Sequence, residues 1–198
     1  LHRMTNLESK LKSGEIIQWA ITEPLANVSL KRLAGTKFDE GRDKYPVPRP
    51  KGYEQLSTFI DLLVANQCVI EDKGKKVKVE TAVLDSYTST NEHVKALILA
   101  ANGSMAMSMP LWGVLLRNFE TLNSTMLSLP CNVIFIVHER WDKDELSGRI
   151  NVRPLIDGQM SNKIGKDFEE VYYLSRYIKG EKIEFTMHPW GDNLRQGR

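Results

Sequence analysis

The 198-residue chain has only two cysteines, no long apolar run and little net charge. No apolar segment reaches the roughly 18 residues that a membrane span needs, so no membrane contact is expected. Cys68 and Cys131 lack the spacing of metal ligands, which favours buried reduced thiols and a cytoplasmic location. A formal net charge of +2 neither indicates nor excludes a nucleic-acid partner, so any such contact would have to come from a local patch.

What the chain does contain is a series of apolar segments with alternating periodicities. These periodicities predict helices at 5–13, 53–66, 91–101, 111–129 and 159–168. They predict strands at 15–21, 81–84, 131–137, 150–156, 171–177 and 182–188. The stretches 71–76 and 141–149 are expected to be charged loops. Strand and helix alternate through the first two thirds of the chain. This order predicts an α/β fold with a mostly parallel central sheet and helices on both faces. The last two strands are expected to form a C-terminal antiparallel hairpin.

The segment Thr81–Leu84 ends in a lone carboxylate, Asp85, which two hydroxyl residues follow, Ser86 and Thr88. A short run of apolar and β-branched residues fits a strand that is buried on both faces of a parallel sheet. Ligands in open α/β sheets bind beyond the carboxyl ends of such strands. An acid there can hold Mg²⁺, directly or through water, while the hydroxyls orient phosphate or water. The alternative is that Asp85 caps the next helix.

Two other polar side chains come just after predicted strands. Glu23 follows the strand expected at 15–21, and His138 follows the strand expected at 131–137. If these ends share an edge with Asp85, Glu23 can act as a general base, and His138 can hydrogen-bond a phosphate or the attacking water. The alternatives are a surface glutamate before a proline and a structural histidine.

The charged loop expected at 141–149 combines an aromatic ring with positive charge. Arg140, Trp141, Lys143 and Arg149 together have the composition that holds a phosphate backbone while a base stacks. The alternative is a solvated loop in which the neighbouring acids cancel the positive charge.

In this order, the landmarks resemble the RecA-like recombinase and ATPase core. The similarity rests on W-A-I-T-E-P at 19–24, the strand ending in Asp85 and Ser86, the loop at 102–110, and I-F-I-V-H-E at 134–139. The segment P-L-I-D-G-Q-M-S-N-K-I-G-K-D-F-E-E-V-Y-Y-L looks like phage-encoded ATPases of this group. The resemblance implies ATP, Mg²⁺ on Asp85, a cofactor contact from Ser86, and Glu23 and His138 as catalytic residues. It also implies single-stranded DNA as partner, in recombination or annealing, and subunits assembled as a homo-oligomer in the host cytoplasm.

One departure from the family concerns its phosphate-binding loop. The motif G-x-x-x-x-G-K-[ST] is absent from the printed sequence, and in the family it would lie immediately before the helix expected at 5–13. The expectation is therefore a RecA-like core at 1–188 without its N-terminal phosphate loop, followed by a polar tail at 189–198. ATP hydrolysis is expected if such a loop precedes residue 1. The alternative is a non-catalytic scaffold or assembly protein with a degenerate nucleotide site.

Overall fold

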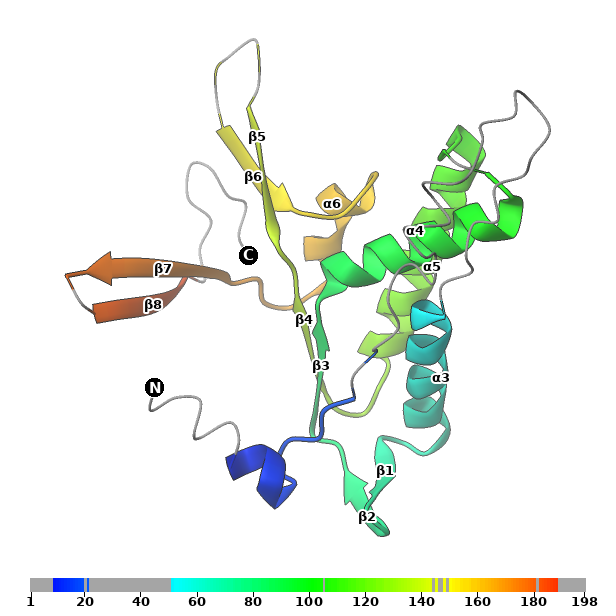
Figure 1. The fold of residues 1–198 in the computed structure, drawn as a ribbon, viewed down its shortest axis with the longest axis vertical. Helices are drawn as coiled ribbons and strands as arrows, with labels where there is room; N and C mark the ends of the chain where they lie inside the picture. The colour runs from blue at the N-terminus through cyan, green and yellow to red at the C-terminus, as the bar shows by residue number, and fades with distance from the viewer. Residues whose placement is uncertain are drawn as a thin grey trace, which may run out of the picture.

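The computed structural model describes residues 9–19, 21, 51–104, 106–143, 145, 148, 150–180 and 182–188. Glu23, Arg149 and the tail at 189–198 lie outside these residues. The named elements of the described part, shown in Figure 1, are α3 (Gly52–Ala65), β1 (Val69–Asp72), β2 (Lys75–Lys78), β3 (Thr81–Asp85), α4 (Tyr87–Asn102), α5 (Met109–Leu127), β4 (Asn132–Ile136), β5 (Glu139–Lys143), β6 (Ile150–Pro154), α6 (Met160–Lys163), the 3₁₀ turn η1 (Ile164–Asp167), β7 (Tyr173–Lys179) and β8 (Lys182–His188).

Three long helices, α3, α4 and α5, pack together beside β3 and β4 (Figure 1). Each helix turns an apolar stripe inward, as its helical spacing predicts. The stripe residues that are buried are Leu56, Ile60 and Leu63 of α3, Val94 and Ile98 of α4, and Leu115, Phe119, Leu122 and Met126 of α5. These side chains together form the hydrophobic core of the described part of the chain.

The end of α3 is shaped by two residues in the left-handed region. Gln67 has φ 49° and Cys68 has φ 60°. The amide of Gln67 donates to the carbonyl of Val64 at 3.3 Å, and the amide of Cys68 donates to that of Leu63 at 2.7 Å. This is the Schellman arrangement, in which glycine is the preferred residue at the position of Gln67 because a Cβ is disfavoured there.

We therefore expect Gln67→Gly to raise the free energy of unfolding by about 0.5–1 kcal/mol, since the left-handed conformation no longer strains a Cβ. Urea denaturation followed by circular dichroism measures the change. Gly103 provides a matched control, because it ends α4 in the same way with φ 57°. Gly103→Ala should shift stability in the opposite direction by about 1 kcal/mol. A destabilised Gln67→Gly variant would contradict this account of the turn.

The strands β3 and β4 form the parallel pair of the described chain, with Val83 opposite Ile134 and Asp85 opposite Ile136. The helices cover one face of this pair, where Leu84 and Phe135 join the core. Val83, Ile134 and Ile136 alternate with these residues and are exposed on the other face. The predictions of burial on both faces and of a mostly parallel central sheet are therefore wrong for the described residues.

Antiparallel ribbons replace the rest of that expected sheet. Of the predicted strand at 15–21, residues 17–19 and 21 have no strand conformation. The charged stretch expected as a loop at 71–76 instead pairs β1 with β2, because Lys73 and Gly74 both take the positive φ of a tight hairpin turn. The start of the loop expected at 141–149 is part of β5, which pairs with β6. The C-terminal hairpin is confirmed as β7–β8.

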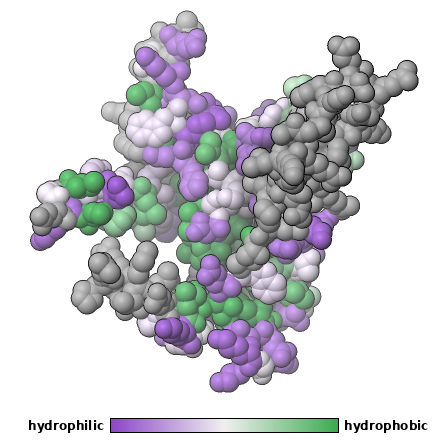
Figure 2. Space-filling model, viewed as in Figure 1, coloured by the Kyte–Doolittle hydropathy of each residue, from purple (hydrophilic) through white to green (hydrophobic). Residues whose placement is uncertain are grey.

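The β7–β8 hairpin projects away from the helices and has one apolar face. Figure 2 shows hydrophobic residues along this arm. Five apolar side chains on one face of the hairpin are more than half exposed: Leu174, Ile178, Ile183, Phe185 and Met187. Large exposed apolar patches mark interaction surfaces in folded proteins. In the described part of the chain, no helix is both long enough and apolar enough to cross a membrane.

Candidate functional site

The carboxyl ends of β3 and β4 lie side by side and bring two predicted site residues to one edge. Asp85 ends β3, and His138 follows β4 by two residues. The amide of His138 donates to Oγ1 of Thr88 at 3.1 Å, which ties the end of β4 to the first turn of α4. The carbonyl of His138 accepts from the amide of Leu155 at 2.7 Å. The backbone of His138 is thus fixed, while its side chain is exposed at the edge.

Asp85 does not cap the helix that follows it. The cap is Ser86, whose hydroxyl accepts a hydrogen bond from the amide of Ser89 at 3.1 Å. Asp85 is exposed, and among the described residues its carboxylate has no hydrogen bond or ion pair. Its side chain lies on the same side of the parallel pair as Val83 and Ile136, away from the helices. The carboxylate is therefore open to an incoming ligand, whereas the hydroxyl of Ser86 is already used by α4.

No group of three or more metal-ligating side chains occurs in the described ranges. Mg²⁺ does not require one, because proteins commonly hold it through one or two carboxylates while substrate phosphates and water complete its shell. The open carboxylate of Asp85 fits that donor set, while the N-terminus of the 16-residue helix α4 beside it favours the phosphate. The arrangement can accept Mg²⁺ together with a phosphate but cannot enclose a bare ion.

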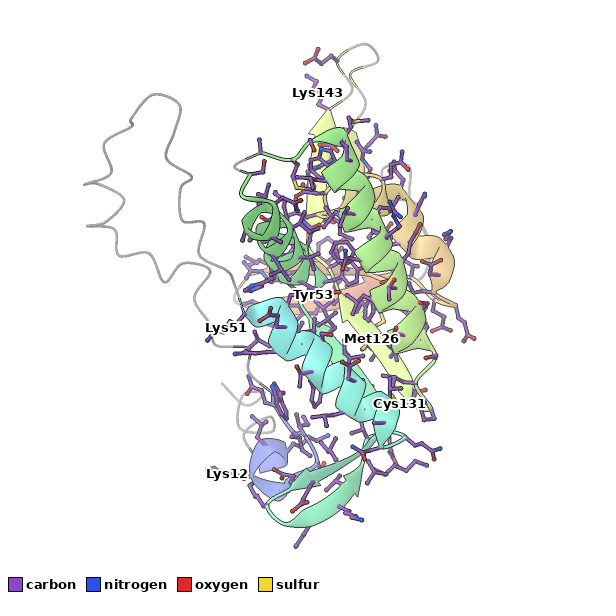
Figure 3. All side chains as sticks on the ribbon, turned by 90° about the vertical axis from the view of Figure 1, so that its right-hand side faces the viewer. Lys12, Lys51, Tyr53, Met126, Cys131 and Lys143 are labelled. Carbon is purple, nitrogen blue, oxygen red and sulfur yellow. The ribbon has the colours of Figure 1, made fainter. Side chains whose placement is uncertain are left out.

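The β5–β6 ribbon divides the predicted nucleic-acid residues between its two faces. Trp141 and Lys143 alternate with Arg140 along β5, so the first two share one face and Arg140 lies on the other. Trp141 is 54% exposed, and its indole nitrogen donates to Glu139 Oε1 at 3.0 Å. Figure 3 places Lys143 at the far end of the ribbon. The structure therefore brings together Trp141 and Lys143 but separates them from Arg140.

Arg140 is held by an acid of its own strand. Its Nε lies 3.1 Å from Oδ1 of Asp142, and Arg153 of β6 places Nη2 2.7 Å from Oδ2 of the same carboxylate. Desolvation alone would raise the pKa of Asp142, but the hydrogen bonds and charges of the two guanidinium groups outweigh it and lower that pKa. For Arg140, the structure thus favours the alternative in which a neighbouring acid offsets the positive charge.

Sequence reasoning missed Arg153 and a second polar cluster on α4. Lys95 Nζ lies 2.7 Å from Oδ2 of Asp157, and the amide nitrogen of the Asn91 side chain lies 3.1 Å from the same oxygen. Asn91 is 2% exposed. Asp157 follows β6 closely, so the cluster fastens the end of the ribbon to α4. A lone aspartate before Gly158 is an ordinary turn signal, and the sequence held no clue to its partners.

The Asp157 cluster makes stability depend on pH in the acid range. Burial acts to raise the pKa of Asp157, but hydrogen bonds from Lys95 and Asn91 outweigh it and lower the pKa. A lowered folded-state pKa gives stability that is present above the unfolded value of about 3.9 and is lost as pH falls through the folded pKa. Asp157→Asn should therefore unfold at lower urea than the parent chain at pH 7, and this difference should shrink below about pH 4. A difference that stays constant down to pH 2.5 would contradict the ion pair.

Comparison with known proteins identifies the family to which the chain belongs. A family model described as an AAA domain matches residues 26–190, which is most of the chain. No curated protein and no solved structure matches the chain. The matched range includes the strand-end edge with Asp85 and His138 as well as the whole β5–β6 ribbon. The chain therefore belongs to the AAA domain family of P-loop NTPases.

Proposed function

We propose that this chain is the core of an ATP-dependent protein that binds single-stranded DNA in recombination or annealing. The observation that supports this most is the direct path from β4 into β5. The edge that presents Asp85 and His138 continues within a few residues into the ribbon that presents Trp141 and Lys143. A nucleotide-binding edge and a surface for bases and phosphates would thus be parts of one continuous strand path.

The family membership implies nucleotide binding, and in this proposal the nucleotide would bind at the strand-end edge. Asp85 would hold Mg²⁺ through its open carboxylate, and the exposed imidazole of His138 would hydrogen-bond a phosphate oxygen or the attacking water. Bound Mg²⁺ would offset phosphate charge. Glu23 stays in the proposal as the general base. Ser86 would act less directly, by capping α4 so that its first amides face the phosphates.

Single-stranded DNA would bind to the Trp141 face of the ribbon. The exposed indole offers a flat surface on which a base can stack, and the Lys143 ammonium can approach the neighbouring phosphate. Among the described residues, no ion pair occupies Lys143. Arg140 would contribute indirectly, by pairing with the same Asp142 carboxylate that Arg153 of β6 binds, and Arg149 remains a proposed phosphate contact.

The exposed apolar face of β7–β8 supports a homo-oligomer, because a monomer rarely leaves such a surface in water. Phe185→Glu puts a charge in the centre of this face and is expected to reduce the assembly to single chains. Thr186→Glu is the matched control, since Thr186 is also exposed but lies on the opposite face. Light scattering after size-exclusion chromatography gives the masses. Equal masses for both variants and the parent chain would remove this face from the interface.

Fluorescence anisotropy of a labelled single-stranded oligonucleotide tests the function directly, with and without Mg-ATP and across a salt series. Tighter binding with Mg-ATP in the parent chain, but not in Asp85→Ala, is the expected result. Binding that ignores ATP in both would refute the nucleotide role of Asp85. Absence of binding at low salt would refute the DNA partner, because electrostatic contacts are strongest there.

A scaffold without nucleotide chemistry is the second candidate. The absence of the phosphate-loop motif from the printed sequence favours it, as do the exposed apolar faces of the β3–β4 pair and of β7–β8. Under this alternative, assembly would persist while neither ATP nor DNA would bind in the anisotropy experiment.

A further inference from the structure

Two cysteines that are 63 residues apart in the sequence meet at one end of the parallel pair. The sulfur atoms of Cys68 and Cys131 lie 3.5 Å apart, and both thiols are free. Cys68 is fully buried, and Cys131 is partly exposed. We propose that these residues are an oxidative modification site, where a mild peroxide oxidant converts the two thiols into one intramolecular disulfide.

The backbone around both residues is fixed, so the approach of the sulfurs is a property of the fold. Cys68 donates from its amide to Leu63, and its carbonyl accepts from the amide of Val79 at 2.7 Å. Next to Cys131, the amide of Asn132 donates to the carbonyl of Glu80 at 2.9 Å. A disulfide has a bond length of about 2.05 Å, so the sulfurs must close by about 1.5 Å. Because the backbone hydrogen bonds hold both main chains in place, this movement would have to come from side-chain rotation.

The two thiols are suited to different steps. Burial raises the pKa of Cys68 to about 11, and its S–H group points toward the sulfur of Cys131. Cys131 is the accessible thiol and reacts first: its thiolate sulfur attacks one peroxide oxygen, the O–O bond breaks, and the leaving hydroxide takes a proton to form water. The sulfur of Cys68 then attacks the resulting sulfenic sulfur. The S–O bond breaks and the hydroxyl group leaves with the proton of Cys68 as water, so two thiols and one peroxide give one disulfide and two waters.

The pair lies at the end of β3 and β4 that is opposite to Asp85 and His138. Cys131 directly precedes β4, and Figure 3 shows it in the lower half of the molecule, whereas Lys143 is near the upper end. The disulfide would therefore join the α3–β1 junction to the start of β4 and leave the candidate site unchanged. It would stabilise the chain by restricting a long loop of the unfolded state.

Mass spectrometry and thermal unfolding test the proposal. The purified protein is treated with a small excess of hydrogen peroxide, then denatured, alkylated and weighed. The expected product has lost two hydrogens and takes up no alkylating reagent, and dithiothreitol restores two reactive thiols. Its melting temperature should rise by roughly 5–15 °C.

Cys68→Ser and Cys131→Ser serve as controls, and each should fail to form the product that lacks two hydrogens. In Cys131→Ser, the buried Cys68 should also resist alkylation while the protein is folded, which checks the assigned order of reaction. Two thiols that still take up reagent after peroxide treatment would overturn the proposal. A product that is cross-linked only between chains, or one with Cys131 oxidised beyond sulfenic acid and Cys68 still free, would also overturn it.

Discussion

Replacing Tyr87 by alanine is expected to lower the free energy of unfolding by about 3–5 kcal/mol, the usual effect of removing a large buried aromatic side chain. Tyr87 is 0% exposed, and its ring lies 5.0 Å from the rings of both Phe119 and Phe135. It therefore joins α4 to α5 and to β4. Because domains are stable by only about 5–15 kcal/mol, Tyr87→Ala should lose a large share of the free energy of unfolding and should unfold at a clearly lower urea concentration than the parent chain.

Tyr87→Phe separates the contribution of the ring from that of the hydroxyl. The phenol hydroxyl donates to Oδ1 of Asn123 at 2.7 Å, and Asn123 is itself 2% exposed. Removing the hydroxyl leaves this oxygen buried without its donor, at an expected cost of about 1–3 kcal/mol. Urea denaturation of both variants gives the two values. If alanine cost no more than phenylalanine, the ring would not be part of the core, and the packing described here would be wrong.

Under the proposed function, Trp141→Ala is expected to weaken binding of single-stranded DNA by roughly 5–150-fold, which corresponds to the 1–3 kcal/mol of one stacked base. Trp141→Phe should keep most of the affinity, because phenylalanine still offers an aromatic face. The side chain is 54% exposed, so both variants should unfold at nearly the parent temperature. Anisotropy titrations at one fixed salt concentration measure the affinities.

Two lysine substitutions, compared with each other, distinguish a specific phosphate contact from non-specific electrostatic attraction. Lys143→Ala removes a cation from the Trp141 face, whereas Lys75→Ala removes an exposed cation from the β1–β2 hairpin. The first change should reduce the salt slope of binding by about 0.7, the value for one phosphate contact on a single strand, and the second should leave it unchanged. Equal slopes for the two variants would count against the ribbon as the DNA surface, as would full affinity in Trp141→Ala.

The helices were predictable because their apolar stripes recur at helical spacing. The helix expected at 53–66 is α3, at Gly52–Ala65, and the helix expected at 111–129 is α5, at Met109–Leu127. The helix expected at 91–101 begins earlier, at Tyr87, because Ser86 caps it. Serine is a favoured N-cap residue, so Ser86 is a local signal for this start, although its position after Asp85 also fits a ligand contact.

Strand pairing was harder to predict because it depends on contacts between distant residues. A charged stretch such as 71–76 has the composition of a loop, yet the two-residue turn at Lys73 and Gly74 pairs its halves as a hairpin. Trp141 belongs to β5 because β6 is its neighbour, which the spacing within 141–149 does not reveal. The apolar pattern of Val83 and Ile134 predicts cover on both faces, whereas in the described chain the helices cover one face.

For the candidate site, the order of elements in the sequence predicts which residues lie at the strand-end edge, but it does not predict the hydrogen bonds between them. Asp85 and His138 share an edge, as expected for the ends of neighbouring parallel strands. The hydrogen bond from the His138 amide to Thr88 could not be derived from sequence, because it joins side chain and backbone across 50 residues. Glu23 and Arg149 lie outside the described residues, so their predicted roles remain predictions.

The double attachment of His138 has a mechanical consequence. Its amide is bound to Thr88 of α4 and its carbonyl to Leu155 beyond β6, so the residue is clamped where β4 leaves the parallel pair. The β5–β6 ribbon extends from this clamp, and the ion pair between Asp142 of β5 and Arg153 of β6 joins its two strands. The same two hydrogen bonds thus join the strand-end edge to the base of the ribbon, so a displacement of either one acts on the backbone of His138.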